Sequence, residues 1–234
     1  MSMLVLGIES ASAEVGVALG GEDGVIASAQ SSRDRRHAEN LTPQIEFICR
    51  QAQVELSEVG CIAVDVGPGL FTGLRVGLSS AMALAHGLDV PMIGVSSLEL
   101  GAFAARYTDT TILPCYDARR GEVFSARYSA TGDGVESLSE PRVSTPDELA
   151  EDLQASGEPV LMVGDGGKRY HEIFSTIDTV QFAGPGLWYP SARSLVELTY
   201  PRAIAGDTMS PGEIEPLYLR LPDAEINWKT RDGR

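Results

Sequence analysis

Two stretches decide the fold of this chain: LVLGIESASAEVGVAL, residues 4–19, and ILPCYDARRGEVFSAR, residues 112–127. Aligned along their length, they place Glu9 on Asp117, Glu14 on Glu122 and Val15 on Val123. Each stretch reads as an apolar strand that ends in a carboxylate, a small polar turn and a second strand. The repeat predicts two related lobes, although two unrelated hairpins can also match to this degree.

Around these hairpins the chain alternates short apolar runs with amphipathic segments. Strands are expected at residues 25–31, 61–66 and 92–95, and helices at residues 37–54 and 72–86. Strands that first follow one another and then alternate with helices indicate mixed sheets flanked by helices. We therefore expect an α/β fold with an N-terminal lobe over residues 1–108 and a C-terminal lobe over residues 109–234.

The composition is that of a folded globular protein, with 43% hydrophobic and 22% charged residues. No apolar run is long enough to span a bilayer, and no basic segment precedes the first apolar run, so we expect a cytoplasmic protein without a membrane partner. Cys49, Cys61 and Cys115 are widely spaced within apolar runs, which favours buried thiols over disulfides or a metal site.

The charge of the chain limits its partners. Lys and Arg total 18 against 33 Asp and Glu, a formal net charge of −15. Because nucleic-acid binding requires clustered cations that neutralise phosphates, the chain alone should bind nucleic acid poorly. If the chain acts on nucleic acid, a partner would have to supply the basic surface.

Two carboxylates are the first candidates for chemistry. Glu9 and Asp117 each end a strand and precede a turn of small residues, so they are placed to face one another across a cleft between the lobes. Paired carboxylates in this position hold a magnesium–nucleotide complex in some folds. Acidic residues also commonly start hairpin turns, and the sequence does not decide between the two interpretations.

Glycine-rich turns give weaker signals. The stretch VDVGPGLFTGLRVG, residues 64–77, has the strand–turn–helix order that cradles phosphates, but it lacks the Gly-Lys-Ser/Thr ending of a P-loop. Gly77, Ser80 and Ala81 would let a second helix approach closely, either a partner's or the preceding helix of this chain. Residues 164–167 could touch a nucleotide, but their composition favours a plain turn.

Catalytic motifs are missing from the sequence. His37, His86 and His171 form no pair at metal-binding spacing, and no Gly-x-Ser-x-Gly nucleophile elbow is present. The residues alone therefore predict a two-lobed α/β protein with a candidate nucleotide cleft and no recognisable catalytic machinery.

Five segments in order give the chain a family resemblance: LGIESASAEVGVAL, HAENLTPQIE, VDVGPGLFTGLRVGLSSAMALAHGLDVPMIGVSSLE, DARRGEVFSARY and PLYLR. They cover nearly the whole chain, and it resembles the TsaB family, also called YeaZ. The resemblance implies an actin-like, sugar-kinase-like (ASKHA) fold. It further implies a non-catalytic partner of the paralogous subunit TsaD, joined by the small ATPase TsaE.

In that family the complex transfers a threonylcarbamoyl group to the adenosine next to the anticodon, in tRNAs that read codons starting with A. The resemblance implies that tRNA is bound only through the complex and that the free chain can form a homodimer. We expect no tightly bound cofactor, with ATP or ADP binding left open. The alternatives are a small-molecule kinase that uses the cleft and, less favoured, a metallopeptidase.

The resemblance also carries over to single residues. The catalytic paralogue has an Asn-His-x-x-x-His metal motif where this chain has Ser96, Ser97 and Gly101, so both imidazole ligands are missing. The family's first strand usually ends in Asp, whereas this one ends in Glu9. A vestigial nucleotide site is therefore expected at Glu9, Asp117, Gly164, Asp165 and Gly166. The resemblance and the small helix residues together predict a partner contact at Leu41, Ile45, Leu74, Gly77, Leu78 and Ala81.

Overall fold

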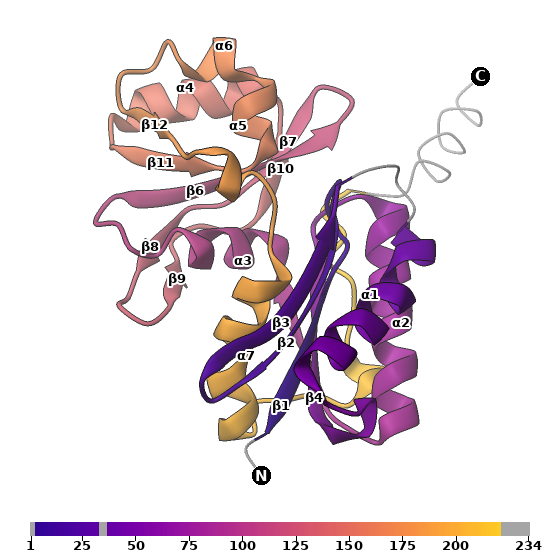
Figure 1. The fold of residues 1–234 in the computed structure, drawn as a ribbon. Coiled ribbons are helices and arrows are strands. Elements are labelled where there is room, and N and C mark those ends of the chain that lie inside the picture. Colours follow the sequence, from indigo (N-terminus) through magenta and orange to yellow (C-terminus); the bar gives the residue numbers. More distant parts are fainter. Residues whose placement is uncertain (1–2, 33–36, 221–234) are drawn as a thin grey trace, which may run out of the picture.

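The computed structural model describes residues 3–32 and 37–220, which form two β-sheets with helices on their faces (Figure 1). The first sheet has the strand order β3-β2-β1-β4-β5, with β1 to β3 antiparallel and β4 and β5 parallel to β1. Its strands are β1 (Leu4–Glu9), β2 (Val15–Gly21), β3 (Gly24–Ser31), β4 (Val59–Gly67) and β5 (Met92–Ser96).

The second sheet repeats this arrangement. Its order is β10-β7-β6-β11-β12, again with three antiparallel strands followed by two parallel ones. The strands are β6 (Thr111–Arg119), β7 (Glu122–Ser125), β10 (Arg142–Ser144), β11 (Val160–Val163) and β12 (Val180–Phe182). Two further strands extend the sheet: β8 (Tyr128–Ala130) pairs with β6, and β9 (Val135–Ser137) pairs with β8. The shared order confirms the predicted α/β fold of two related lobes.

Helices cover both sheets. They are α1 (His37–Ala52), α2 (Phe71–Leu88), α3 (Ser97–Ala104), α4 (Pro146–Ser156), α5 (Asp165–Arg169), α6 (His171–Phe174) and α7 (Ala192–Ala205). Helices α1 and α2 cover one face of the first sheet, and α7 covers the other (Figure 1). Three short 3-10 turns lie at Leu56–Glu58, Pro185–Leu187 and Pro211–Glu213. Within the described ranges, every helix is too short or too polar to cross a lipid bilayer.

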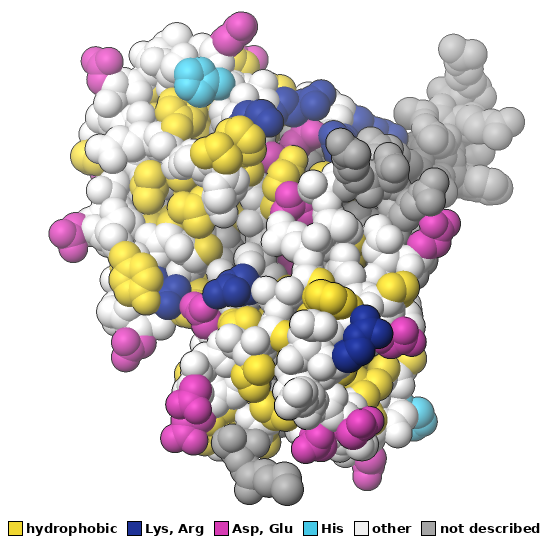
Figure 2. Space-filling model, in the orientation of Figure 1, with side chains coloured by type: hydrophobic (Ala, Val, Ile, Leu, Met, Phe, Trp, Pro, Cys, Tyr) yellow, Lys and Arg dark blue, Asp and Glu magenta, His cyan; other side chains and the backbone are white. Residues whose placement is uncertain are grey.

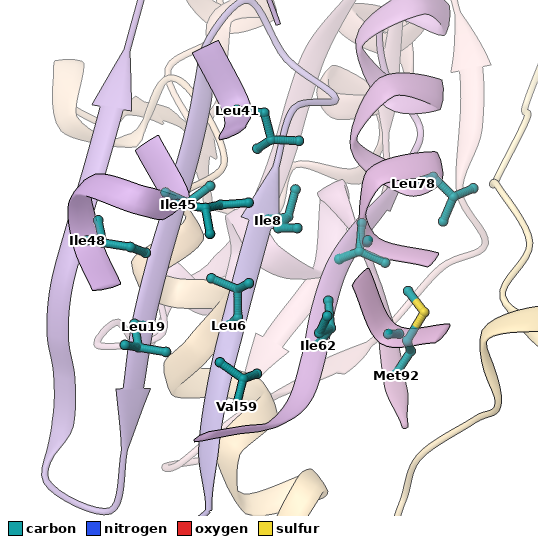
Figure 3. Packing of buried hydrophobic residues seen from close by; sticks show 14 of the residues in the cluster. Leu6, Ile8, Leu19, Leu41, Ile45, Ile48, Val59, Ile62, Leu78 and Met92 are labelled. Carbon is teal, nitrogen blue, oxygen red and sulfur yellow. The ribbon is translucent and has the colours of Figure 1, made fainter. Parts of the chain in front are cut away.

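The core of the first lobe lies between the sheet and α1. Figure 3 shows Leu6 and Leu19 from the strands beside Ile45 and Ile48 from α1, and all four are buried. The apolar side chains of α1 recur at three- and four-residue intervals, so they form one face of the helix. That periodicity in the sequence predicted the helix correctly, and the face covers the chain's own sheet.

Helix α7 does not follow the expected division of the lobes at residue 108. It belongs to the second half of the sequence but packs on the first sheet, where Leu195 and Val196 are buried in one cluster with Val5 and Ala18. The close approach depends on Gly7, because a Cβ there would lie 2.9 Å from Val196 Cγ2. Periodicity predicts that a helix buries one face, but not which sheet receives it.

Helix α3 shows the reciprocal exchange. It belongs to the first half of the sequence, yet Leu98 and Ala102 are buried with Ile112 and Tyr116 of the second sheet. The two lobes therefore share helices at their junction, and this junction holds the candidate site.

Candidate functional site

The carboxyl ends of β1 and β6 meet at a cleft between the lobes. The enclosed space is about 20 Å³, room for about one water molecule. Its walls include Ala11, Ser12, Pro68, Gly69, Tyr116, Asp117, Asp165 and Pro190. Ligand pockets usually span hundreds of Å³, so a nucleotide would need the lobes to separate before it could enter.

Glu9 lies at the end of β1 and is 1% exposed. The backbone N–H of Ser12 donates to its Oε1 at 3.1 Å, and the Ser12 hydroxyl donates to Oε2 at 3.4 Å. Burial, and then the nearby charge of Asp65, raise the pKa of Glu9 well above its usual value. The charged neighbour of Glu9 is thus a carboxylate from its own lobe.

Asp65 is the site residue that the sequence analysis missed. It lies on β4 and is 2% exposed. Its Oδ1 accepts hydrogen bonds from the Ser97 hydroxyl at 2.6 Å and from the Gly67 N–H at 2.7 Å, while Oδ2 has no partner among the described residues. Burial raises the pKa of Asp65 to about 7. Its position within the apolar run 61–66 could have revealed it in the sequence. A strand buried on both faces also buries its carboxylate, and a buried carboxylate needs hydrogen-bond partners.

Asp117 is paired within the second lobe. Arg119 Nη1 lies 2.9 Å from its Oδ2, and Arg169 Nε lies 3.6 Å from its Oδ1. Its backbone N–H donates to Asp165 Oδ1 at 3.0 Å, which brings two of the expected nucleotide-site residues together. A carboxylate neutralised by two guanidiniums is a poor ligand for Mg²⁺. Across the described ranges, no group of three or more His, Cys, Asp or Glu side chains is arranged to hold a metal ion.

Gly164 and Gly166 have a packing role in this structure. A Cβ at Gly164 would lie 2.2 Å from the carbonyl oxygen of Cys115, and one at Gly166 would lie 2.7 Å from the same atom. Only glycine lets the turn after β11 lie this close to β6. These contacts account for both glycines without a nucleotide.

The six residues predicted to contact a partner are all buried inside this chain: Leu41, Ile45, Leu74, Gly77, Leu78 and Ala81. They face the first sheet and its loops, and a Cβ at Gly77 would lie 2.1 Å from Ser10 Oγ. The sequence showed that both helices carry apolar stripes, and these stripes form the core of the lobe. A partner that docks on α2 would instead meet its outward-facing residues.

Comparison with known proteins places the chain in a family. The family model described as tRNA N6-adenosine threonylcarbamoyltransferase, TsaD, matches residues 24–228. The tRNA threonylcarbamoyladenosine biosynthesis protein TsaB of Bacillus subtilis is 30% identical over 97% of this chain and 98% of its own length. The chain belongs to the TsaB family. The TsaB protein of Escherichia coli is also 30% identical, over 99% of this chain and 100% of its own.

Solved structures agree with the TsaB assignment. YeaZ from Pseudomonas aeruginosa has a TM-score of 0.80 at 25% identity, covering 93% of this chain and 100% of that one. Component A of the (R)-2-hydroxyglutaryl-CoA dehydratase of Acidaminococcus fermentans has a TM-score of 0.52 at 11% identity, which shows a shared fold alone. The actin-like, sugar-kinase-like fold is thereby confirmed.

In this TsaB-family chain, the two positions that the resemblance matched to metal-ligating histidines make other contacts. The Ser97 hydroxyl donates to Asp65. A Cβ at Gly101 would lie 2.0 Å from the Tyr116 hydroxyl oxygen, so Tyr116 fills the space beside that glycine. The structure leaves no room for an imidazole at position 101.

Proposed function

We propose that this TsaB-family protein acts in tRNA threonylcarbamoyladenosine biosynthesis in the cytoplasm as the non-catalytic partner of a TsaD-like subunit. Together with a TsaE-like ATPase, the pair would transfer the threonylcarbamoyl group to the adenosine next to the anticodon of tRNAs that read codons starting with A. The names of the Bacillus and Escherichia relatives support the pathway. The match to the TsaD family model supports a paralogue as the partner.

The composition of the outward face of α2 is the main support for a scaffolding role. Over its 18 residues, Arg75 is the one permanently charged side chain. Thr72, Ser79 and Ala83 are exposed, and Val76, Ser80, Met82 and Leu84 are half-buried. A helix on a protein surface normally turns a charged face to water, so a small, weakly polar face supports close helix–helix docking.

An aromatic cluster borders this face. Phe71 and Tyr218 are each 39% exposed, and their ring centroids lie 5.6 Å apart. The Arg75 guanidinium lies 3.9 Å from the centroid of the Phe71 ring, and its Nε donates to the Tyr218 hydroxyl at 3.0 Å. Exposed aromatic and arginine side chains held in one arrangement resemble the anchors of protein interfaces.

The cleft supports the non-catalytic part of the proposal. Asp117 is neutralised by two arginines, and Tyr116 fills the space beside Gly101. The same pairing disfavours a small-molecule kinase, which needs carboxylates that are free to bind metal. An isolated chain that turned over ATP would favour the kinase instead.

The test is reconstitution with the TsaD-like and TsaE-like subunits from the same organism. We supply the mixture with ATP and with threonylcarbamoyl-adenylate labelled in its threonine, which provides the group to be transferred and releases AMP. We expect the label to pass to an unmodified tRNA transcript in the complete mixture, and the transfer to be lost when this chain is omitted. This chain assayed without its partners should give no product. Full activity of the other subunits in its absence, or modification by this chain alone, would contradict the proposal.

A further inference from the structure

Four of the 18 Lys and Arg side chains of this acidic chain come from two neighbouring segments of the second lobe. Arg119 and Arg120 form the turn between β6 and β7, and Lys168 and Arg169 end α5. We call these four residues the basic rim. Figure 2 shows Lys and Arg side chains in a row at the edge of the second lobe. The whole chain carries 18 Lys and Arg against 33 Asp and Glu, so these four cations form a locally basic patch on an acidic protein.

Asp117 binds two of these arginines from the interior of the second lobe. Its side chain is 2% exposed, whereas the Arg119 and Arg169 side chains that it binds are 39% and 56% exposed. The negative charge therefore lies inside the lobe and the positive charges face solvent. Each guanidinium has five N–H donors. Arg119 donates one of them to Asp117 at 2.9 Å, and Arg169 forms an ion pair with Asp117 at 3.6 Å, so donors remain on both side chains for an anionic ligand.

Aromatic rings lie beside two of the four cations. The Lys168 ammonium lies 3.9 Å from the centroid of the Trp188 ring, and the Arg169 guanidinium lies 5.7 Å from that of Tyr170. Trp188 and Tyr170 are both half-buried, so each keeps part of its ring accessible. Cations interleaved with aromatic side chains are typical of surfaces that bind a phosphate backbone and stack on bases.

We infer that the basic rim binds the sugar–phosphate backbone of tRNA in the assembled complex. This inference rests on the proposed function, which supplies tRNA as the substrate. The net charge of −15 leaves the rest of the chain repulsive to phosphates. The rim would therefore set where the RNA can lie as well as add to its affinity. The partner then need not provide the whole basic surface.

The experiment measures the affinity of the reconstituted complex with the TsaD-like subunit for an unmodified tRNA transcript across a salt series. The test variant is Lys168→Gln/Arg169→Gln. The control is Arg142→Gln/Arg193→Gln, which also removes two positive charges, one from β10 and one from α7. Circular dichroism and size-exclusion chromatography establish that both variants are folded and assembled.

We expect the rim variant to bind tRNA about tenfold more weakly at 0.15 M salt, with the slope of log K against log salt shallower by about 1.5, because two phosphate contacts are lost. The control should match wild type. Equal affinities and slopes for the rim variant and wild type would overturn the inference, as would equal losses in both variants. The inference would also be overturned if polyglutamate occupied the basic rim and tRNA did not. Failure of the wild-type subunits to assemble or to modify tRNA would count against the proposed function instead.

Discussion

The Tyr116 hydroxyl lies against Gly101, where an added Cβ would be 2.0 Å from its oxygen. Tyr116 comes from β6 and Gly101 from α3, so the contact joins the second sheet to a helix from the first half of the chain. The hydroxyl is buried and has no hydrogen-bond partner among the described residues. Glycine at 101 is therefore favoured by a side chain from the other half of the sequence.

Gly101→Ala should destabilise the protein. The methyl group would overpack against Tyr116 at a cost of about 1–3 kcal/mol, offset in part by about 1 kcal/mol of helix propensity. Tyr116→Phe alone should be neutral or stabilising, because it removes an unpaired buried hydroxyl. When Gly101→Ala is combined with Tyr116→Phe, the alanine should cost less. Urea denaturation of wild type, the two single variants and the double variant measures this coupling, and purely additive effects would show that the contact is not the cause.

The purified chain should hold no stoichiometric transition metal. Position 101 has no space for an imidazole, and the Ser97 hydroxyl is already bonded to Asp65. Elemental analysis after dialysis against a metal-free buffer checks this expectation. One tightly bound iron or zinc ion per chain would contradict it.

The buried acid pair should make the protein less stable as pH rises through the neutral range. The pKa of Asp65 is raised from 3.8 to about 7 by burial, so between those values the folded state keeps a proton that the unfolded state has lost. This contribution favours folding below pH 4 and is lost as pH rises towards 7 and beyond. The raised pKa of Glu9 acts in the same direction.

Asp65→Asn isolates this effect from that of the other carboxylates. The asparagine Oδ1 can still accept from Ser97 and Gly67, and no charge is buried. We expect the variant to be more stable than wild type by roughly 1–4 kcal/mol at pH 8, with a smaller difference at pH 5. Free energies of unfolding from denaturant titrations at both pH values decide the matter. A variant less stable than wild type at pH 8 would refute the assignment.

The sequence predicted local features well because they are periodic. The repeat that aligned Glu9 with Asp117 predicted two hairpins, and the structure places them at equivalent positions of two sheets. Contacts between distant residues carry no such period. The acid within the apolar run 61–66 indicated a buried carboxylate, but not its neighbour. The interleaving of α3 and α7, the approach of Asp65 to Glu9, and the contact of Tyr116 with Gly101 all join separate parts of the chain, so no local pattern indicated these pairings.

Docking of the partner on α2 is tested on its outward face. Ala83 is exposed on that face, so Ala83→Arg should leave the fold intact and place excess volume and charge in a close helix contact. We expect association with the TsaD-like subunit to weaken by at least about a hundredfold, as for truncation of an interface anchor. Ala155→Arg on α4 is the matched control, an exposed helical alanine in the other lobe, and should bind as wild type does.

Gly77→Arg, on the same helix, should have the opposite effect and disrupt the fold. Its inward position leaves only 2.1 Å between an added Cβ and Ser10 Oγ, so arginine there should unfold the lobe and not merely block the partner. Circular dichroism separates the two outcomes, and calorimetry measures binding by the variants that fold. If Ala83→Arg is folded and binds the TsaD-like subunit with wild-type affinity, the partner does not dock on the outward face of α2. If Gly77→Arg is folded and fails only in binding, Gly77 lies at the interface and its packing against Ser10 does not hold in solution.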